Sequence, residues 1–218
     1  MRFADRKQAG DVLAQKLLQY RDNPAVVVLA LPRGGVPVAF EVAQALHAPL
    51  DVFVVRKLGL PGHEEFAMGA IATGGVMVMN PDLASFRIPE AAIEAVVARE
   101  RRELDRREQL YRGDRAPLPV DDRIVILVDD GLATGSTMLA AATAVRRQHP
   151  TRIVVAVPVA ATETCQAFRS VVDDVVCAIT PEPFLAVGAW YEDFGQTSDA
   201  EVHALLEAAA ARDIDRAA

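Results

Sequence analysis

The sequence is short of cysteine and of long apolar runs, and each shortage narrows the class of protein. Only two cysteines occur, Cys165 and Cys177, and neither belongs to a CxxC or other metal-like spacing. We expect two buried thiols in a reducing compartment rather than a disulfide. No apolar run reaches the ~18 residues that a membrane span needs, and the charged N-terminus lacks the apolar segment of a secretory signal. These absences favour a cytoplasmic protein with no membrane partner.

The chain also has no excess of basic residues over acidic ones. The 218 residues include 23 Lys and Arg against 30 Asp and Glu, for a net charge of -7. Proteins whose main partner is a nucleic acid are more often basic, so we expect none here. A small anion is not excluded, because a local basic site can still hold it. With 51% hydrophobic residues, the chain can form one substantial core, and we predict a single domain over 1–218.

Apolar strands and amphipathic helices alternate along the chain. This pattern predicts an α/β fold: a Rossmann-like parallel sheet with helices on both faces and a core over about 24–180. The Gly-rich interval 56–80 is expected to be a long loop with short strands at 67–72 and 76–79. The charged run Arg99-Glu103 is expected to face solvent. The predicted strands are 25–31, 50–55, 123–128, 153–157 and 174–178, and the predicted helices are 5–20, 36–46, 89–111, 136–147, 162–171 and 198–212.

The stretch VILVDDGLATGST, residues 125–137, places two acids at the end of an apolar strand, followed at once by a Gly/Thr/Ser loop. Free N–H groups and hydroxyls at the start of the next helix suit a phosphate. Carboxylates can accept hydrogen bonds from vicinal sugar hydroxyls or bind Mg²⁺. The pattern therefore predicts a sugar phosphate ligand. An ordinary capped turn is the alternative; the spacing matches neither a Walker A loop nor a hydrolase elbow.

The same stretch resembles the phosphoribosyl-pyrophosphate signature of type I phosphoribosyltransferases. The resemblance implies that Asp129 and Asp130 bind the ribose hydroxyls and Mg²⁺, with Asp130 also contributing to catalysis. It implies that the 5-phosphate lies against Ala133, Thr134, Gly135, Ser136 and Thr137. Some members of that family have an acid at the position of Ala133, so no acid–base role is expected there.

Two further strand ends fit this resemblance. LPRGG after the first strand is similar to the family's pyrophosphate loop, which implicates Arg33, Gly34 and Gly35 and a cis peptide between Pro32 and Arg33. An ordinary turn is the alternative. VVRKLG ends the second strand, and Arg56 and Lys57 would stabilise the departing pyrophosphate; two surface cations are the alternative.

The family also has a mobile catalytic loop and an aromatic residue that stacks on the base. The interval of about 57–80 corresponds to that loop, with Glu65 preferred over Glu64 for handling the proton of the nucleobase; an acidic loop tip is the alternative. Phe184 corresponds to the stacking residue, within a hood and closing helix over 181–212. The charged helix 89–112 is an insertion that forms part of a hood or of a subunit contact.

The resemblance implies a Mg²⁺-dependent transferase that moves ribose 5-phosphate from phosphoribosyl pyrophosphate to a nucleobase-like nitrogen acceptor, as in purine salvage. The motifs look most like a bacterial group of predicted members whose acceptor is unassigned. Dimers are common in the family, so a homodimer is among the expectations. A regulator that binds the same sugar and does no chemistry is the alternative, and a hydrolase using Asp129 as nucleophile is a weaker one.

Overall fold

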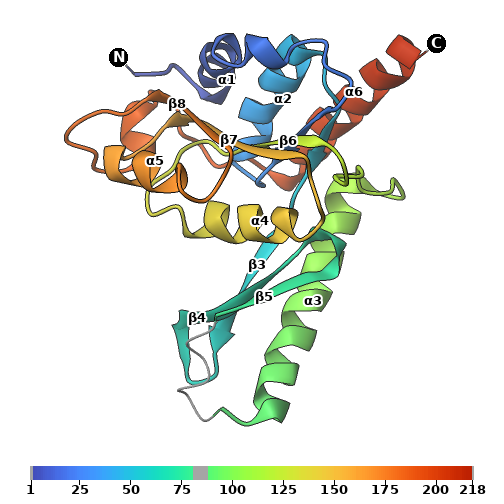
Figure 1. Ribbon diagram of the computed structural model, residues 1–218, viewed down its shortest axis with the longest axis vertical. Helices are drawn as coiled ribbons and strands as arrows, with labels where there is room; N and C mark the ends of the chain where they lie inside the picture. Colours follow the sequence, from blue (N-terminus) through green and yellow to red (C-terminus); the bar gives the residue numbers. More distant parts are fainter. Residues whose placement is uncertain (1, 81–87, 218) are drawn as a thin grey trace.

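A five-stranded parallel sheet forms the centre of the computed structural model, which describes residues 2–80 and 88–217 (Figure 1). The strand order is β2-β1-β6-β7-β8, and every neighbouring pair is parallel. The prediction of a parallel α/β sheet is therefore confirmed. The strands are β1 (Val26–Ala30), β2 (Leu50–Val52), β6 (Ile124–Val128), β7 (Arg152–Val159) and β8 (Asp174–Ile179).

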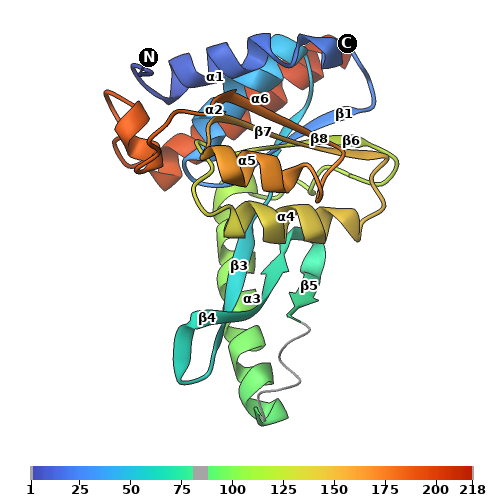
Figure 2. The same ribbon diagram turned by 60° about the vertical axis from the view of Figure 1, so that its left-hand side comes forward.

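Helices cover both faces of this sheet. Helices α1, α2 and α6 lie over one face, and α4 and α5 lie over the other (Figures 1 and 2). Their bounds are α1 (Arg6–Gln15), α2 (Gly35–Leu46), α4 (Ser136–Arg146), α5 (Thr162–Phe168) and α6 (Asp199–Ala217). Asp5 caps α1 by accepting a hydrogen bond from Gln8 N, and Ser198 precedes α6 with its hydroxyl accepting from Glu201 N at 3.1 Å.

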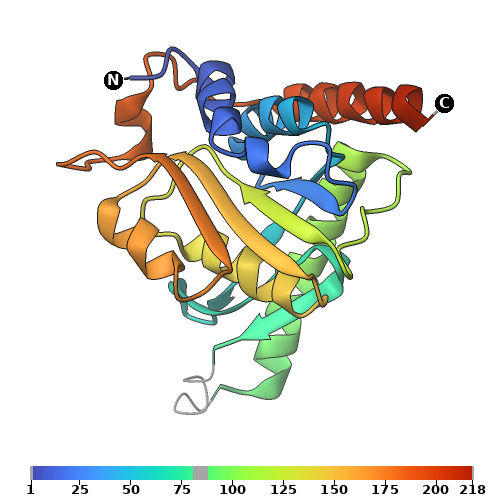
Figure 3. The ribbon, with the colours of Figure 1, turned by 45° about the horizontal axis from the view of Figure 1, so that its top comes forward.

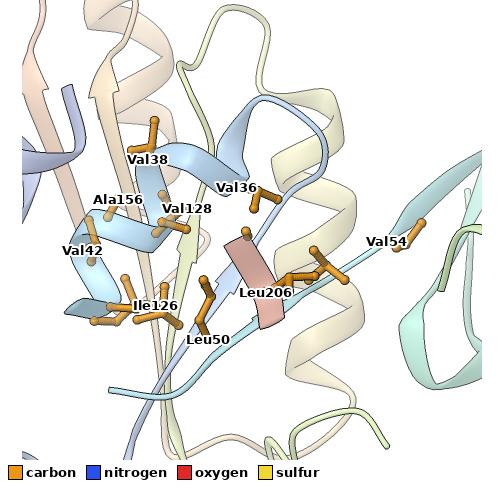
Figure 4. Packing of buried hydrophobic residues seen from close by; sticks show 14 of the residues in the cluster. Val36, Val38, Val42, Leu50, Val54, Ile126, Val128, Ala156 and Leu206 are labelled. Carbon is orange, nitrogen blue, oxygen red and sulfur yellow. The ribbon is translucent and has the colours of Figure 1, made fainter. Parts of the chain in front are cut away.

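The strands are apolar throughout because both faces of the sheet are buried. Successive side chains of a strand point to opposite faces, and β1 divides accordingly. Val26, Val28 and Ala30 pack with α2 and α6 in one cluster, part of which is drawn in Figure 4. Val27 and Leu29 join the cluster on the other face, toward α4 and α5. Two cores thus hold the sheet rigid between the helical layers.

The interval expected to be a long loop with two short strands is an antiparallel sheet of three strands. The expected strands at 67–72 and 76–79 are confirmed within β4 and β5, but the loop expected before them was wrong, because β3 and the beginning of β4 occupy it. The strands are β3 (Val55–Leu60), β4 (His63–Ala72) and β5 (Val76–Met79), in the order β3-β4-β5. Together with the long helix α3 (Glu90–Arg112) they form what we call the arm, which extends from the body beneath α4 (Figures 1 and 2). The apolar pattern was obscured because Gly59, Gly62 and Gly69 interrupt it.

The predicted strand over 50–55 is divided between the two sheets. Leu50–Val52 forms β2 at the edge of the main sheet, and Val55 already begins β3 of the arm. The chain keeps an apolar character across this break because Phe53 and Val54 are both buried. Periodicity alone therefore could not reveal the change of sheet.

The two cysteines are joined in a disulfide, which corrects the expectation of free thiols. Cys165 lies on α5 and Cys177 on β8, and their Cα atoms are 6.7 Å apart. The topology brings this helix and strand together across only 12 residues. The pairing removes the cysteine-based argument for a reducing compartment. Within 2–80 and 88–217, no helix is both long and apolar enough to cross a membrane.

Candidate functional site

Two loops meet at the carboxyl ends of β1 and β6, which are adjacent strands of the main sheet. The first loop contains the cis peptide Pro32–Arg33 expected from the resemblance, followed by Gly34. A methyl group added to Gly34 would overlap the carboxylate of Asp130, and one added to Gly35 would come within 2.7 Å of the carbonyl oxygen of Val128. The glycines are therefore needed for close contact, and the first loop packs directly on the acids.

Asp129 and Asp130 are half-buried at this junction. Oδ1 of Asp129 accepts a hydrogen bond from the backbone N–H of Asp130 at 2.8 Å. Burial raises the pKa of Asp129 well above its ordinary value, and the neighbouring Asp130 carboxylate raises it further. Burial also raises the pKa of Asp130, while the Arg6 guanidinium opposes that rise. A ligand that brings hydroxyl donors or a cation would therefore stabilise the two carboxylates.

The loop after β6 surrounds a cavity of about 160 Å³, which is lined by Asp129, by residues 131–138 and by Val187. Gly135 takes a left-handed conformation, with φ +73°, directly before α4. The Thr164 hydroxyl donates to the carbonyl of Ala133 at 2.7 Å. These contacts fix a concave turn at a helix N-terminus, an arrangement that suits an anion. The predicted residues Ala133, Thr134, Gly135, Ser136 and Thr137 all line this one cavity.

Arg56 and Lys57 do not end a strand, as the sequence suggested, but lie within β3 of the arm. Neighbouring side chains of a strand point in opposite directions, and the two cations separate. Lys57 Nζ donates to the Ser136 hydroxyl at 3.1 Å and so reaches the cavity. The Arg56 guanidinium donates to Glu100 Oε2 of α3 at 2.6 and 3.0 Å. Only Lys57 is brought to the loop after β6.

Glu100 is 7% exposed, so the prediction that the run Arg99-Glu103 faces solvent was wrong at this position. Its two carboxylate oxygens accept from Arg56 and from Arg99. A charged side chain on the core side of a helix is tolerated because these guanidinium groups compensate its charge.

The remaining predicted residues have contacts outside the acid pair or lie on other elements. Arg33 forms an ion pair of 3.6 Å with Asp199 at the start of α6. Phe184 is half-buried and packs against a small cluster that includes Phe3 and Tyr191. The backbone of Glu65 belongs to β4, but its side chain lies outside the described part of the chain.

The segment 181–197 after β8, which we call the hood, is joined to the N-terminus. Phe3 N donates to the carbonyl of Trp190 at 2.8 Å, and Glu192 N donates to the carbonyl of Phe3 at 2.8 Å. The hydroxyl of Tyr191, which is 4% exposed, donates to the backbone carbonyl of Asp130 at 2.6 Å. The hood thus contacts the acid pair through the hydroxyl of Tyr191.

Sequence reasoning missed Arg6 and Tyr191. Arg6 donates to Asp130 across 124 residues, and no local motif signals such a contact. The one available hint was the charge balance, because two half-buried acids beside an anion site require a nearby cation.

A divalent metal fits this donor set in part. The described residues contain no cluster of three or more His, Cys, Asp and Glu side chains. The two carboxylates at the strand end are hard oxygen donors, and Mg²⁺ usually binds one or two of these together with substrate phosphates and water. Asp129 and Asp130 are therefore the residues that could hold Mg²⁺ with a phosphorylated ligand.

Comparison with known proteins adds independent information. The model of the family described as "Phosphoribosyl transferase domain" matches residues 4–184. Two Mycobacterium tuberculosis proteins, from strains H37Rv and CDC 1551, are each named "Putative phosphoribosyl transferase" and are 49% identical to this chain over 208 residues. The match covers 95% of this chain but 47% of each relative. The chain therefore spans about half the length of the curated relatives it matches.

A solved structure matches over nearly its full length. The crystal structure of TT1426 from Thermus thermophilus is 45% identical, with a TM-score of 0.84. The match covers 94% of this chain and 98% of that one. The arm and the main sheet together therefore belong to a fold that is already known by experiment.

Proposed function

This chain belongs to the phosphoribosyl transferase domain family, and on that premise we propose that it transfers ribose 5-phosphate from phosphoribosyl pyrophosphate to a nitrogen acceptor. The observation that carries the proposal is the junction at the ends of β1 and β6. There the acid pair lies between the loop of Arg33, Gly34 and Gly35, which we call the glycine loop, and the cavity of the loop after β6. The sugar would lie across the acids, with its 5-phosphate in the loop after β6 and its pyrophosphate in the loop after β1.

The acid pair is assigned to the ribose. The hydroxyls at C2 and C3 donate to the carboxylates of Asp129 and Asp130, which only accept when ionised. The 5-phosphate occupies the cavity formed by Ala133-Thr137, where backbone N–H groups and hydroxyls donate to it. Lys57 lies beside Ser136, so its ammonium adds positive charge next to the 5-phosphate.

The pyrophosphate is assigned to the glycine loop. Backbone N–H groups of Arg33 and Gly34 donate to its oxygens, while Gly35, whose N–H donates to the carbonyl of Leu31 at 3.1 Å, allows the loop to lie close to the acids. The side chains of Arg33, Lys57 and Arg56 supply positive charge as it departs. For Arg56 this requires release from Glu100. Asp129 and Asp130 are the residues that would hold Mg²⁺, which would supply further charge neutralisation.

Reaction then exchanges one bond for another at C1 of the ribose. The C1–O bond to pyrophosphate breaks with its electron pair leaving on oxygen, and the lone pair of the acceptor nitrogen forms the new C1–N bond. The acceptor's proton passes to a base, for which we assign Glu65. Positioning and fixed charges account for most of the rate. Strand β4, which carries Glu65, belongs to the arm, and its closure over the sugar would exclude water.

The acceptor is proposed to be a purine-like base that stacks on Phe184, which places the protein in nucleotide metabolism such as purine salvage. Stacking of a base on an aromatic ring is worth ~1–3 kcal/mol and tolerates many bases. Phe184→Ala is therefore the variant that separates acceptor binding from sugar binding.

Calorimetry with phosphoribosyl pyrophosphate and Mg²⁺ tests the sugar site. We expect the wild-type protein to bind and the double variant Asp129→Asn, Asp130→Asn to lose binding by at least tenfold, because the hydroxyl acceptors lose their charge. Asp121→Asn, at an exposed aspartate outside the site, serves as the control. Equal affinity of the double variant would contradict the ribose assignment.

A second assay decides whether the bound sugar reacts. Pyrophosphate release is measured with a panel of nucleobases and other amines. Release with one acceptor class supports the transferase and identifies the acceptor. Tight binding without release across the whole panel would replace the transferase with a regulator that senses the sugar.

A further inference from the structure

Arg6, the first residue of α1, contacts the acid pair and the hood at the same time. Its Nε and Nη2 donate to Oδ2 of Asp130 at 2.9 and 2.8 Å. Its Nη1 donates to the carbonyl oxygen of Gly195 at 2.7 Å. The guanidinium carbon also lies 4.1 Å from the centre of the Phe194 ring, a cation–π distance.

The ion pair between Arg6 and Asp130 is largely shielded from water. The side chains of Arg6 and Asp130 are 13% and 17% exposed. A charge pair in such a place is worth more than a surface pair, and removing one partner leaves the other uncompensated. Figure 3 shows the N-terminal segment beside the hood, and the backbone bridge between Phe3 and Tyr191 joins the two. The position of Arg6 is therefore set by elements from both ends of the chain.

The two carboxylate oxygens of Asp130 have different surroundings. Oδ2 lies against Gly34 on one side and receives both Arg6 donors on the other. Both side-chain donors to Asp130 in the described part of the chain come from Arg6, so Oδ1 remains for a ligand. The hydroxyl of Tyr191 holds the backbone of the same residue. The carboxylate plane is thus held in one orientation.

We infer that Arg6 is a positioning residue for sugar recognition: it holds Asp130 so that Oδ1 accepts a ribose hydroxyl. The inference rests on the proposed function, because it concerns the same sugar site. It goes further by assigning a residue outside every motif of the sequence. It also explains how two acids can lie beside two anion-binding loops, since Arg6 supplies the compensating charge.

The experiment compares two ligands that differ by one hydroxyl. Ribose 5-phosphate and 2-deoxyribose 5-phosphate are titrated by calorimetry into the wild type, Arg6→Gln and Arg6→Lys, and melting temperatures are recorded. We expect the wild type to prefer ribose 5-phosphate by about tenfold or more, as for a hydrogen bond to a charged group. In Arg6→Gln this preference should fall to about twofold or less. A loss of general stability would weaken both ligands together and leave their ratio unchanged.

Arg6→Lys tests the geometry rather than the charge. An ammonium carries the same charge but cannot present the planar fork that reaches Asp130 and Gly195 together. We expect an intermediate preference, several-fold below that of the wild type. Lys7→Gln is the matched control, because Lys7 is the next residue of α1 and is 66% exposed in its ion pairs with Asp11 and Glu41. This control should keep the wild-type preference.

Each outcome separates this inference from the proposed function. A wild-type protein that does not distinguish the two sugars would overturn the ribose assignment itself. A wild-type preference that persists in folded Arg6→Gln and Arg6→Lys would overturn the role of Arg6 alone. If the variants do not fold, a crystal of the wild type soaked with ribose 5-phosphate decides. A sugar hydroxyl on Oδ1 with Arg6 still on Oδ2 supports the inference, and displacement of Arg6 overturns it.

Discussion

At the scale of the residue, Gly34 illustrates how tightly the site is built. Its backbone has ordinary helical angles, with φ -59° and ψ -32°. A side chain is therefore excluded by space and not by backbone conformation. The space is taken by the carboxylate of Asp130, which would overlap an added methyl group.

We predict that Gly34→Ala weakens binding of phosphoribosyl pyrophosphate by about 10²-fold, because Asp130 or the loop must shift by a good part of an ångström. Calorimetry measures this loss. Gly75→Ala is the control: it has φ +70° and nothing within 4 Å of an added methyl group. It should cost about 1 kcal/mol of stability through its backbone and leave the affinity unchanged. Unaltered affinity in Gly34→Ala would show that the glycine loop does not contact the sugar site.

At the scale of the element, charged side chains hold the arm together and fix it to the body, in addition to packing. Arg56 of β3 pairs with the buried Glu100 of α3. At the C-terminal end of α3, Arg112 donates to Asp51 of β2 at 2.9 Å, and both residues are about 5% exposed. Asp51 also accepts from Leu118 N at 3.0 Å. The arm is therefore fixed to the body at β2 through Arg112, while the pair of Arg56 and Glu100 joins β3 to α3 within the arm and so helps to position Lys57.

We predict that Glu100→Gln speeds amide hydrogen exchange in β3 and β4 about tenfold, since the guanidinium of Arg56 loses a charged partner. Exchange followed by mass spectrometry resolves these strands. Glu103→Gln is the control, because Glu103 pairs with Arg106 and Arg107 along the outer side of the same helix. It should leave exchange in β3 unchanged. Equal rates in both variants would mean that packing alone holds the arm.

At the scale of the whole molecule, the buried acid pair lowers the stability of the native fold. Burial and repulsion by the neighbouring Asp130 carboxylate raise the pKa of Asp129, so the native protein holds more protons than the unfolded chain between the unfolded pKa, near 3.9, and the folded pKa. Stability therefore falls as the pH rises from that value through the folded pKa. Above the folded pKa the full cost is present.

We predict that Asp129→Asn stabilises the protein at pH 7 while weakening sugar binding. A gain of about 0.5–2 kcal/mol is usual when such a functional cost is removed, and in a chain of this size each kcal/mol raises the melting temperature by about 2–4 °C. Thermal unfolding without Mg²⁺ measures the gain, with exposed Asp121→Asn as reference. The advantage should shrink as the pH is lowered toward 3.9. A variant less stable than the wild type at pH 7 would contradict this account.

The sequence by itself determined the parts that depend on local pattern. Alternation of apolar strands and amphipathic helices predicted the parallel sheet and both helical layers. The run from Val125 to Thr137 pointed to the acids and their adjoining loop, and the resemblance of LPRGG pointed to the glycine loop after β1. Each of these patterns lies within one short stretch of the chain, so a single window contains the information.

Only the tertiary structure decided which distant groups meet. It divided 50–55 between two sheets, sent Arg56 and Lys57 to opposite sides of β3, buried Glu100 and joined Cys165 to Cys177. It also brought Arg6 onto Asp130. The physical reason is that such contacts depend on how the chain closes on itself. Closure follows from the packing of whole elements, and the residues that meet need share no local pattern.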